Sequence, residues 1–236
     1  YTAGISWRQS TLNRGLLATR GASQSVSLEA AIPGSDLEYF RLTYNGQLYV
    51  PVTNSLTLRF RTELGYGDGY GNIDKLPFFQ HFYAGGFSSV RGYRANTLGP
   101  RSTPADIYSI SQAATAIDAS GNATALSAQG AYVLNPDTGK LEVNTSSFDD
   151  DSVPFGGNVL VEGSIELLFP LPFVKDQRSV RSGLFIDAGN VFSTSCGATQ
   201  LNCSSPKASE LRYSAGFGVT WITGFGPLTF SLGRAL

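Results

Sequence analysis

The sequence Val159-Leu160-Val161-Glu162-Gly163-Ser164-Ile165-Glu166-Leu167-Leu168-Phe169 indicates the fold class, because its side chains alternate in character with a period of two. Successive side chains of a β-strand point to opposite faces. Apolar side chains at 159, 161, 165, 167 and 169 would share one face, and the carboxylates of Glu162 and Glu166 would share the other. Prolines at 170 and 172 end the pattern, since proline cannot continue a strand ladder. The stretch predicts a strand with one greasy and one charged face.

The same alternation recurs on both sides of this stretch. The further candidate strands cover residues 1–8, 25–32, 40–50, 56–66, 181–189, 211–221 and 228–232. Most have about the 9–11 residues that a tilted membrane strand needs. Arg59, Arg61 and Glu63 repeat on one face, and aromatic residues lie near several strand ends, as in an interfacial girdle. A water-soluble β-sandwich also alternates, but strand length and charge placement favour an all-β, antiparallel transmembrane barrel of the outer-membrane type.

Composition excludes two other classes of protein. The formal net charge of -1 and the sequence pI near 5.8 give no basic surface for nucleic acid. No run of residues approaches the ~20 continuous apolar residues of a membrane-spanning helix. A barrel escapes that requirement because only alternate side chains face lipid, so a mean hydropathy of -0.04 is compatible with it. No linker divides the sequence, so residues 1–236 are interpreted as one domain.

The connections between the strands differ greatly in length. Short turns at 33–36 and 223–226 are assigned to one rim, and the loops at 11–22, 68–155 and 193–209 are assigned to the other, external rim. The loop 68–155 is far longer than an ordinary connection, which predicts a functional or disordered segment. Its second half, 113–151, reads as a polar surface excursion. The acidic run 149–151 could bind calcium, although a solvated acidic surface is the simpler interpretation.

Cysteine and histidine are rare in the chain. Cys196 and Cys203 lie in a Gly/Ser/Asn-rich segment, which predicts a loop disulfide formed in an oxidising compartment, with two free thiols as the alternative. The only histidine, His81, is distant in sequence, so no zinc or other metal site is expected. A hydrolase would also need a base beside a nucleophile, and His81 fits better as a packed loop residue.

The first half of the long loop carries a glycine-rich motif. It contains Phe82-Tyr83-Ala84-Gly85-Gly86 and then Val90-Arg91-Gly92-Tyr93-Arg94. The segment is too apolar for a free tip, so we expect it to pack on another part of the molecule. Here the sequence resembles the BamA family of barrel-assembly insertases, in which a Val-Arg-Gly-Phe/Tyr motif follows a Phe-Tyr-Ala-Gly-Gly run in the sixth extracellular loop. Further similar stretches are 32–36, 38–39, 66–69, 96–100, 156–158 and 226–228.

This resemblance implies a location and a function. Residues 1–236 would be the C-terminal portion of the barrel, corresponding to strands eight to fifteen of sixteen, in the outer membrane of a bacterium. The whole protein would be the central subunit that inserts and folds client β-barrel proteins, with companion lipoproteins, in contact with outer-membrane lipid and lipopolysaccharide. It would use no cofactor and would not be an enzyme. A protein-translocation pore of the same superfamily, or a passive porin, remains the alternative.

The resemblance also implies a role for the motif arginine. In the family the loop enters the barrel lumen and its arginine meets acidic residues of the wall; the matching positions are Arg91, Glu166 and Asp187. Alternation independently turns both carboxylates away from lipid. Gly92 would let the loop backbone approach the wall closely. The alternative is that Arg91 is an exposed loop charge and Glu166 an ordinary pore-lining residue.

Eight strands pose a geometric problem for this arrangement. A closed eight-stranded barrel is only wide enough inside for side chains, which leaves no room for an inserted loop. Unpaired strand edges are not tolerated in lipid. We therefore expect either a small closed barrel with a displaced motif loop, or pairing of the open edges with another copy. Without the family's terminal strands, this stretch alone should lack the seam used for insertion and be inactive.

Overall fold

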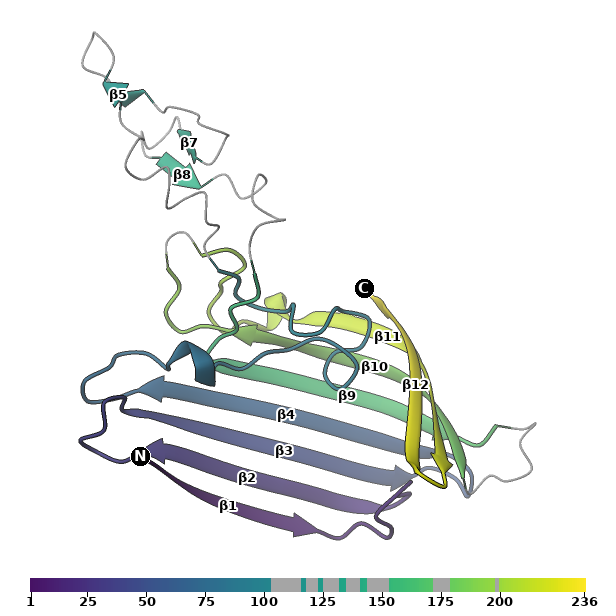
Figure 1. Cartoon of the computed structure of the whole chain (residues 1–236). Helices are drawn as coiled ribbons and strands as arrows, with labels where there is room; N and C mark the ends of the chain where they lie inside the picture. Colours follow the sequence, from purple (N-terminus) through teal and green to yellow (C-terminus); the bar gives the residue numbers. More distant parts are fainter. Residues whose placement is uncertain are drawn as a thin grey trace.

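One antiparallel sheet of eight strands forms the body of the protein (Figure 1). The computed structural model describes residues 1–102, 153–171, 179–197 and 200–236, and the backbone of four short strands between 116 and 143. The sheet runs in the order β1 (Thr2–Ser10), β2 (Gly21–Ala31), β3 (Tyr39–Pro51), β4 (Thr57–Gly69), β9 (Val159–Phe169), β10 (Val180–Phe192), β11 (Arg212–Thr223) and β12 (Gly226–Ala235). The predicted all-β fold and its eight strands are confirmed.

The remaining elements are short. Strands β5 (Ala116–Ile117) and β6 (Ala123–Thr124) pair with each other, as do β7 (Tyr132–Leu134) and β8 (Leu141–Val143). Single 3-10 turns occur at η1 (Phe78–Gln80) and η3 (Ala208–Glu210). The predicted polar excursion over 113–151 lies largely, and the acidic run 149–151 entirely, outside the described residues. No helix in the described part of the chain is long and apolar enough to cross a membrane.

The two faces of the sheet differ as the alternation predicts. In β10, Leu184 and Ile186 are 52% and 57% exposed, whereas their neighbours Phe185 and Asp187 are 2% and 0% exposed. Strand β9 alternates in the same way, with Glu162 and Ser164 among its buried positions. Burial of charged side chains beside exposed leucine and isoleucine reverses the order of a water-soluble protein. One face is therefore suited to lipid and the other to a polar interior.

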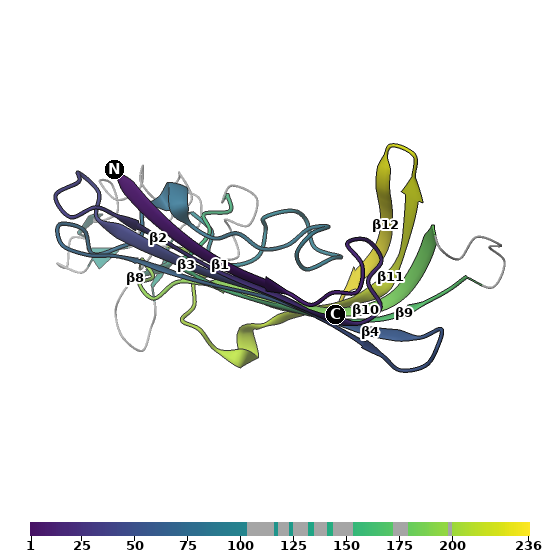
Figure 2. The same cartoon turned by 90° about the horizontal axis from the view of Figure 1, so that it is seen from below.

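The sheet is an open trough and not a closed barrel. Among the described residues β1 and β12 are the edge strands and do not pair with each other. Figure 2 shows β11 and β12 curling upward while β1 to β4 remain nearly flat, with the teal segment that follows β4 on the concave side. The expected small barrel with a displaced motif loop is thus wrong, because the loop occupies the space that closure would remove. Pairing of the edges with another copy stays a prediction.

Strand direction corrects the expected assignment of the rims. Tyr39 pairs with Gly69 and Phe192 pairs with Val159, so the turn 32–38 lies on the same rim as the long loop and the cysteine loop. The loop 11–20 lies on the opposite rim with the turns 52–56 and 224–225. The sequence-based assignment of 11–22 and of 33–36 was wrong, because consecutive connections alternate between the rims: the first, third and seventh share one rim, and the second, fourth and sixth share the other.

Glu38 joins the turn 32–38 to the start of the long loop. Its carboxylate accepts hydrogen bonds from the backbone N–H of Gly34 at 2.7 Å and of Asn72 at 3.0 Å. These bonds lower the pKa of the Glu38 carboxyl below its ordinary value. The contact places the two connections side by side on one rim, which we take as the external rim because it carries the long loops.

Candidate functional site

The segment 82–98 of the long loop lies across the concave face of the sheet (Figure 1). It begins with two backbone hydrogen bonds between Phe82 and Gly157, and it folds back on itself where Ala84 bridges Leu98. A buried apolar cluster fixes it to β9 and β10. The cluster consists of Phe82, Ala84, Val90, Leu98, Leu160 and Val191. The expectation of a packed segment, made from its apolar and glycine-rich sequence, agrees with this position.

Arg91 meets Asp187 through three hydrogen bonds. Its Nε donates to Asp187 Oδ2 and its Nη2 donates to Asp187 Oδ1, each at 2.8 Å. The backbone N–H of Arg91 also donates to Asp187 Oδ2 at 3.0 Å. Two parallel charge-assisted bonds of this kind fix orientation as well as distance. The loop is thereby held to β10 by both its side chain and its main chain.

Other groups of the wall complete the surroundings of Arg91. Its Nη1 lies 3.4 Å from Glu166 Oε1, and its Nη2 donates to Ser164 Oγ at 3.2 Å. Ser164 in turn donates to Asp187 Oδ1 at 2.6 Å. The guanidinium carbon lies 3.4 Å from the centre of the Phe185 ring, a cation–π arrangement. Strands β9 and β10 together therefore present a polar and aromatic socket to one arginine.

This socket is nearly closed to solvent. The side chain of Arg91 is 13% exposed and that of Asp187 is 0% exposed. Taking two charges out of water is expensive, and the attraction between them offsets that expense only with good geometry. Removal of either partner from such a pair destabilises a protein by about 3–5 kcal/mol, because the other charge is left buried. The arrangement can position a loop.

The turn just before Arg91 has its own contacts with the wall, which the sequence-based interpretation missed. Arg61 donates to the carbonyl oxygens of Ser88 and Ser89, the latter at 2.7 Å. The Ser89 hydroxyl donates to Glu162, and it accepts the N–H of Gly85 at 2.8 Å. Arg61 and Glu162 share the inward face with Arg59 and Glu166, which was the available signal, but nothing in the sequence says which loop atoms they reach.

The remaining motif residues occupy distinct positions. Val90 is 1% exposed in the apolar cluster, and the Tyr93 hydroxyl donates to the carbonyl of Tyr213 at 3.1 Å. Gly92 has a φ of 92°, and an added Cβ would lie 3.1 Å from the backbone of Arg234 and Ala235. The loop backbone thus lies against the end of β12. Arg94 is exposed.

The Phe-Tyr-Ala-Gly-Gly run supports the loop. Phe82 is 3% exposed beneath the guanidinium of Arg41, whose carbon lies 4.3 Å from the centre of the ring, whereas Tyr83 is 40% exposed. Gly85 and Gly86 have φ values of 100° and 103°, a region that side chains other than glycine rarely adopt. These glycines let the chain reverse toward Val90.

Cys196 and Cys203 form a disulfide in the loop that follows β10, with a sequence separation of 7. The loop also contacts the long loop, because the N–H of Arg101 donates to the carbonyl of Leu201 at 2.9 Å. The disulfide links two parts of the surface loop between β10 and β11, and it does not take part in the contacts of Arg91. It closes a small loop on the external rim.

His81 is a packed loop residue. Its ring nitrogens lie 3.0 and 3.2 Å from the carbonyl oxygens of Phe155 and Leu76, and the ring meets Phe155 edge to face. Within the described residues, no group of three or more His, Cys, Asp or Glu side chains is arranged to hold a metal ion.

Comparisons with known proteins match this geometry to one superfamily. A family model described as the Omp85 superfamily domain matches residues 1–236. The outer membrane protein assembly factor BamA of Neisseria meningitidis serogroup B is 33% identical over 98% of this chain. The crystal structure of BamA from Haemophilus ducreyi lacking POTRA domains 1–3 is similar over 100% of the chain, with a TM-score of 0.72 and 25% identity. The chain spans 26% of the first relative and 38% of the second.

Proposed function

The chain belongs to the Omp85 superfamily, and from that premise we propose that it forms part of a machine that inserts and folds β-barrel proteins in the bacterial outer membrane. Similarity to an assembly factor over 98% of the chain supports this function. The observation that carries it is the socket of Arg91, because it attaches a loop to the inner wall of the sheet by contacts at Asp187, Glu166 and Ser164.

The attached loop provides a mechanical role. Its backbone lies against β12 at Gly92, its arginine is held by β10, and its turn is held by Arg61 of β4. One loop thus ties together strands from both halves of the sheet. We propose that this bracing keeps the wall in its trough shape while the edge strands of the whole barrel engage a client.

The proposed partners follow from the faces of the sheet. The convex face exposes Leu184, Ile186 and Trp221, at 52%, 57% and 49%, and would contact outer-membrane lipid and lipopolysaccharide. Client β-barrel proteins and companion lipoproteins would bind the whole protein, of which residues 1–236 would be the C-terminal portion of the barrel. The role requires no cofactor or covalent chemistry, so we propose that the protein is not an enzyme.

A reconstitution experiment tests the function. The whole protein that contains this chain is placed in lipid vesicles, and the folding rate of an added client barrel is measured. Arg91→Ala should slow client folding at least about tenfold, since it leaves the buried Asp187 carboxylate without its cation. Arg94→Ala is the matched control, because Arg94 lies three residues away in the same loop and is exposed.

The outcome separates the alternatives. Accelerated client folding that depends on Arg91 supports an assembly insertase. Solute or polypeptide passage through the vesicles without any acceleration of client folding would contradict the proposal and favour a porin or a translocation pore. Equal client folding by the Arg91→Ala and Arg94→Ala proteins would show that the socket has no part in the activity.

A further inference from the structure

A cavity of about 330 Å³ lies on the concave face, between the segment 82–98 and the rim that carries the loop 11–20 and the turns 52–56 and 224–225. Its size is within the range of small-ligand sites, which is about 300–1,000 Å³. Phe87 and Ser88 of the motif loop line its inner end, and Ile222 and Pro227 line it near the rim. The segment 15–18, between β1 and β2, forms one side. The cavity is therefore closed by two loops that come from opposite rims.

The charges that line this cavity are unbalanced. Its charged side chains are Arg59, Arg61, Arg91, Arg181 and Glu166. Arg91 is neutralised by Asp187, and Arg59 lies 3.1 Å from Glu166. Within the described residues Arg61 and Arg181 form no ion pair, and each donates only to backbone carbonyl oxygens.

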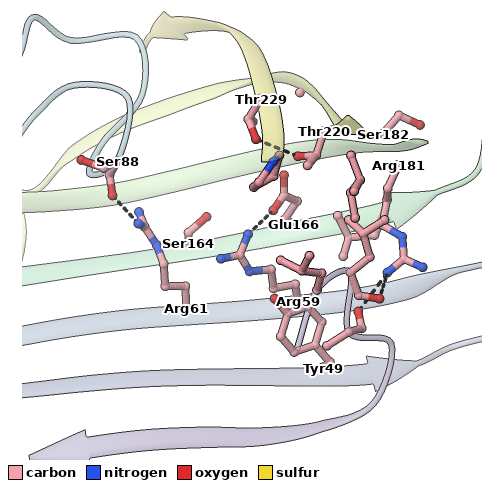
Figure 3. A pocket seen from close by; sticks show the side chains of 18 of the residues that line it. Tyr49, Arg59, Arg61, Ser88, Ser164, Glu166, Arg181, Ser182, Thr220 and Thr229 are labelled. Carbon is pink, nitrogen blue, oxygen red and sulfur yellow. Dashed lines mark hydrogen bonds and ion pairs between the residues drawn. The ribbon is translucent and has the colours of Figure 1, made fainter. Parts of the chain in front are cut away.

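Arg181 is the clearest case. One of its terminal nitrogens, Nη1, donates to the carbonyl oxygens of Leu17 and Ala18 at 3.1 and 2.9 Å. A carbonyl oxygen satisfies a hydrogen bond, but it does not neutralise a charge. The Nε of Arg59 is also buried without a hydrogen-bond partner within the described residues. Figure 3 shows Arg59 and Arg181 among the side chains around the cavity, with the hydroxyls of Thr220 and Thr229 nearby.

Glycine keeps the middle of the cavity open. Gly183 and Gly218 line it from β10 and β11. A Cβ added at Gly218 would meet its nearest atom, the carbonyl oxygen of Phe230, at 3.5 Å, which is ordinary contact. A side chain at position 218 would therefore fit without a clash, and it would occupy part of the cavity. Leu16, Phe87 and Ile222 add apolar walls to the cationic ones.

We propose that this cavity binds a small oxyanion, a carboxylate or a phosphate, carried on a compact apolar body. The charged head would neutralise Arg181, while the apolar body would contact Leu16 and Phe87. Carboxylate and phosphate match the planar donor fork of arginine. A chain-end carboxylate and a phosphoryl group are the two sources of this chemistry, and the proposal does not depend on the insertase activity.

Fluorine NMR of the intact protein in detergent tests the proposal with small probes. We expect 4-fluorobenzoate to bind at least about tenfold more tightly than the neutral 4-fluorobenzamide, because the amide lacks the charge. Arg181→Gln should weaken benzoate binding about tenfold, and Gly218→Leu should abolish it by filling the cavity. Arg8→Gln, which removes a cation from β1 outside the cavity, should leave binding unchanged.

Two further measurements keep the result clear. Phenyl phosphate competing better than benzoate would identify a phosphoryl ligand, and the reverse would identify a carboxylate. Circular dichroism of each variant checks that the sheet is retained. If Arg181→Gln disturbs the segment 15–18, Gly218→Leu still tests the cavity, because it alters no charge and does not touch that segment. Equal binding of benzoate and benzamide, no binding of any anion, or benzoate binding that survives both variants would overturn the proposal.

Discussion

Two arginines on the same concave face, Arg91 and Arg181, are held in opposite ways. Arg91 meets the carboxylates of Asp187 and Glu166, whereas the described contacts of Arg181 are with the backbone carbonyls of Leu17 and Ala18. A carboxylate cancels charge, so the first arginine is locked in place. A carbonyl oxygen does not neutralise the guanidinium charge, so Arg181 can still attract an anion. The acceptor, and not the arginine, separates a structural contact from a candidate binding site.

The largest effect is expected when the locked arginine loses its partner. Asp187→Ala leaves the Arg91 guanidinium buried without its main acceptor, which should lower the free energy of unfolding by about 3–5 kcal/mol. Urea unfolding in lipid vesicles measures it. Asp36→Ala is the control, since Asp36 is exposed in the turn 32–38. A similar loss in both variants would mean that the socket is not a special site.

A smaller effect is expected from the close approach of the loop to β12. Gly92→Val combines a φ of 92° with a Cβ that would press on the backbone of Arg234, and should cost about 1–3 kcal/mol. The same unfolding measurement applies. Gly224→Val, in a turn where an added Cβ meets nothing within 4 Å, should be nearly neutral. If Gly92→Val is as mild as Gly224→Val, the loop does not rest on β12.

Arg181, which meets no carboxylate among the described residues, should matter less to stability. Arg181→Gln removes the charge-assisted bonds to two carbonyls, but it also removes a half-buried charge that no described carboxylate offsets. We expect a loss of about 1 kcal/mol or less. Arg91→Gln in the same assay should be several-fold more damaging. Equal losses from the two substitutions would remove the distinction between a carboxylate and a carbonyl acceptor.

At Glu38 the charges are opposite to those at Arg181, because a carboxylate is held there by backbone N–H groups. Its hydrogen bonds to Gly34 and Asn72 hold its pKa below the ordinary value of 4.5. The stability that it contributes is complete above pH 4.5 and is lost as the pH falls through the lowered pKa. Glu38→Gln should flatten that acid dependence slightly. An unchanged acid limb of the unfolding curve would show that the turn 32–38 is not fixed by this charge.

Much of the fold could be predicted from sequence because period-two alternation is a local property. The expected strand 159–169 coincides with β9, and the inward position of Asp187 follows from counting residues along β10. The extent of strands was less certain: 181–189 proved to be 180–192, because hydrogen bonds to β9 and β11 extend the ladder past the alternating residues.

What the sequence could not show depends on distant contacts. The position of the loop on the concave face depends on its contacts with Leu160 and Val191, which no strand pattern encodes. The contacts of Arg61 with Ser88 and Ser89 depend on where the turn of the motif lies above β4. The role of the segment 15–18 was missed because its rim was assigned wrongly, and Arg181 reaches it across more than 160 residues of sequence, a separation of 163 to Ala18.

A double-mutant cycle between Arg91 and Asp187 measures whether these two residues hold the loop to β10 as one unit. The free energy of unfolding is measured for the parent protein, for Arg91→Ala, for Asp187→Ala and for the double variant. The socket predicts that the double variant loses less stability than the sum of the two single losses, by at least about 1.5 kcal/mol. Losses that add within about 0.5 kcal/mol would contradict it, because independent sites behave in that way.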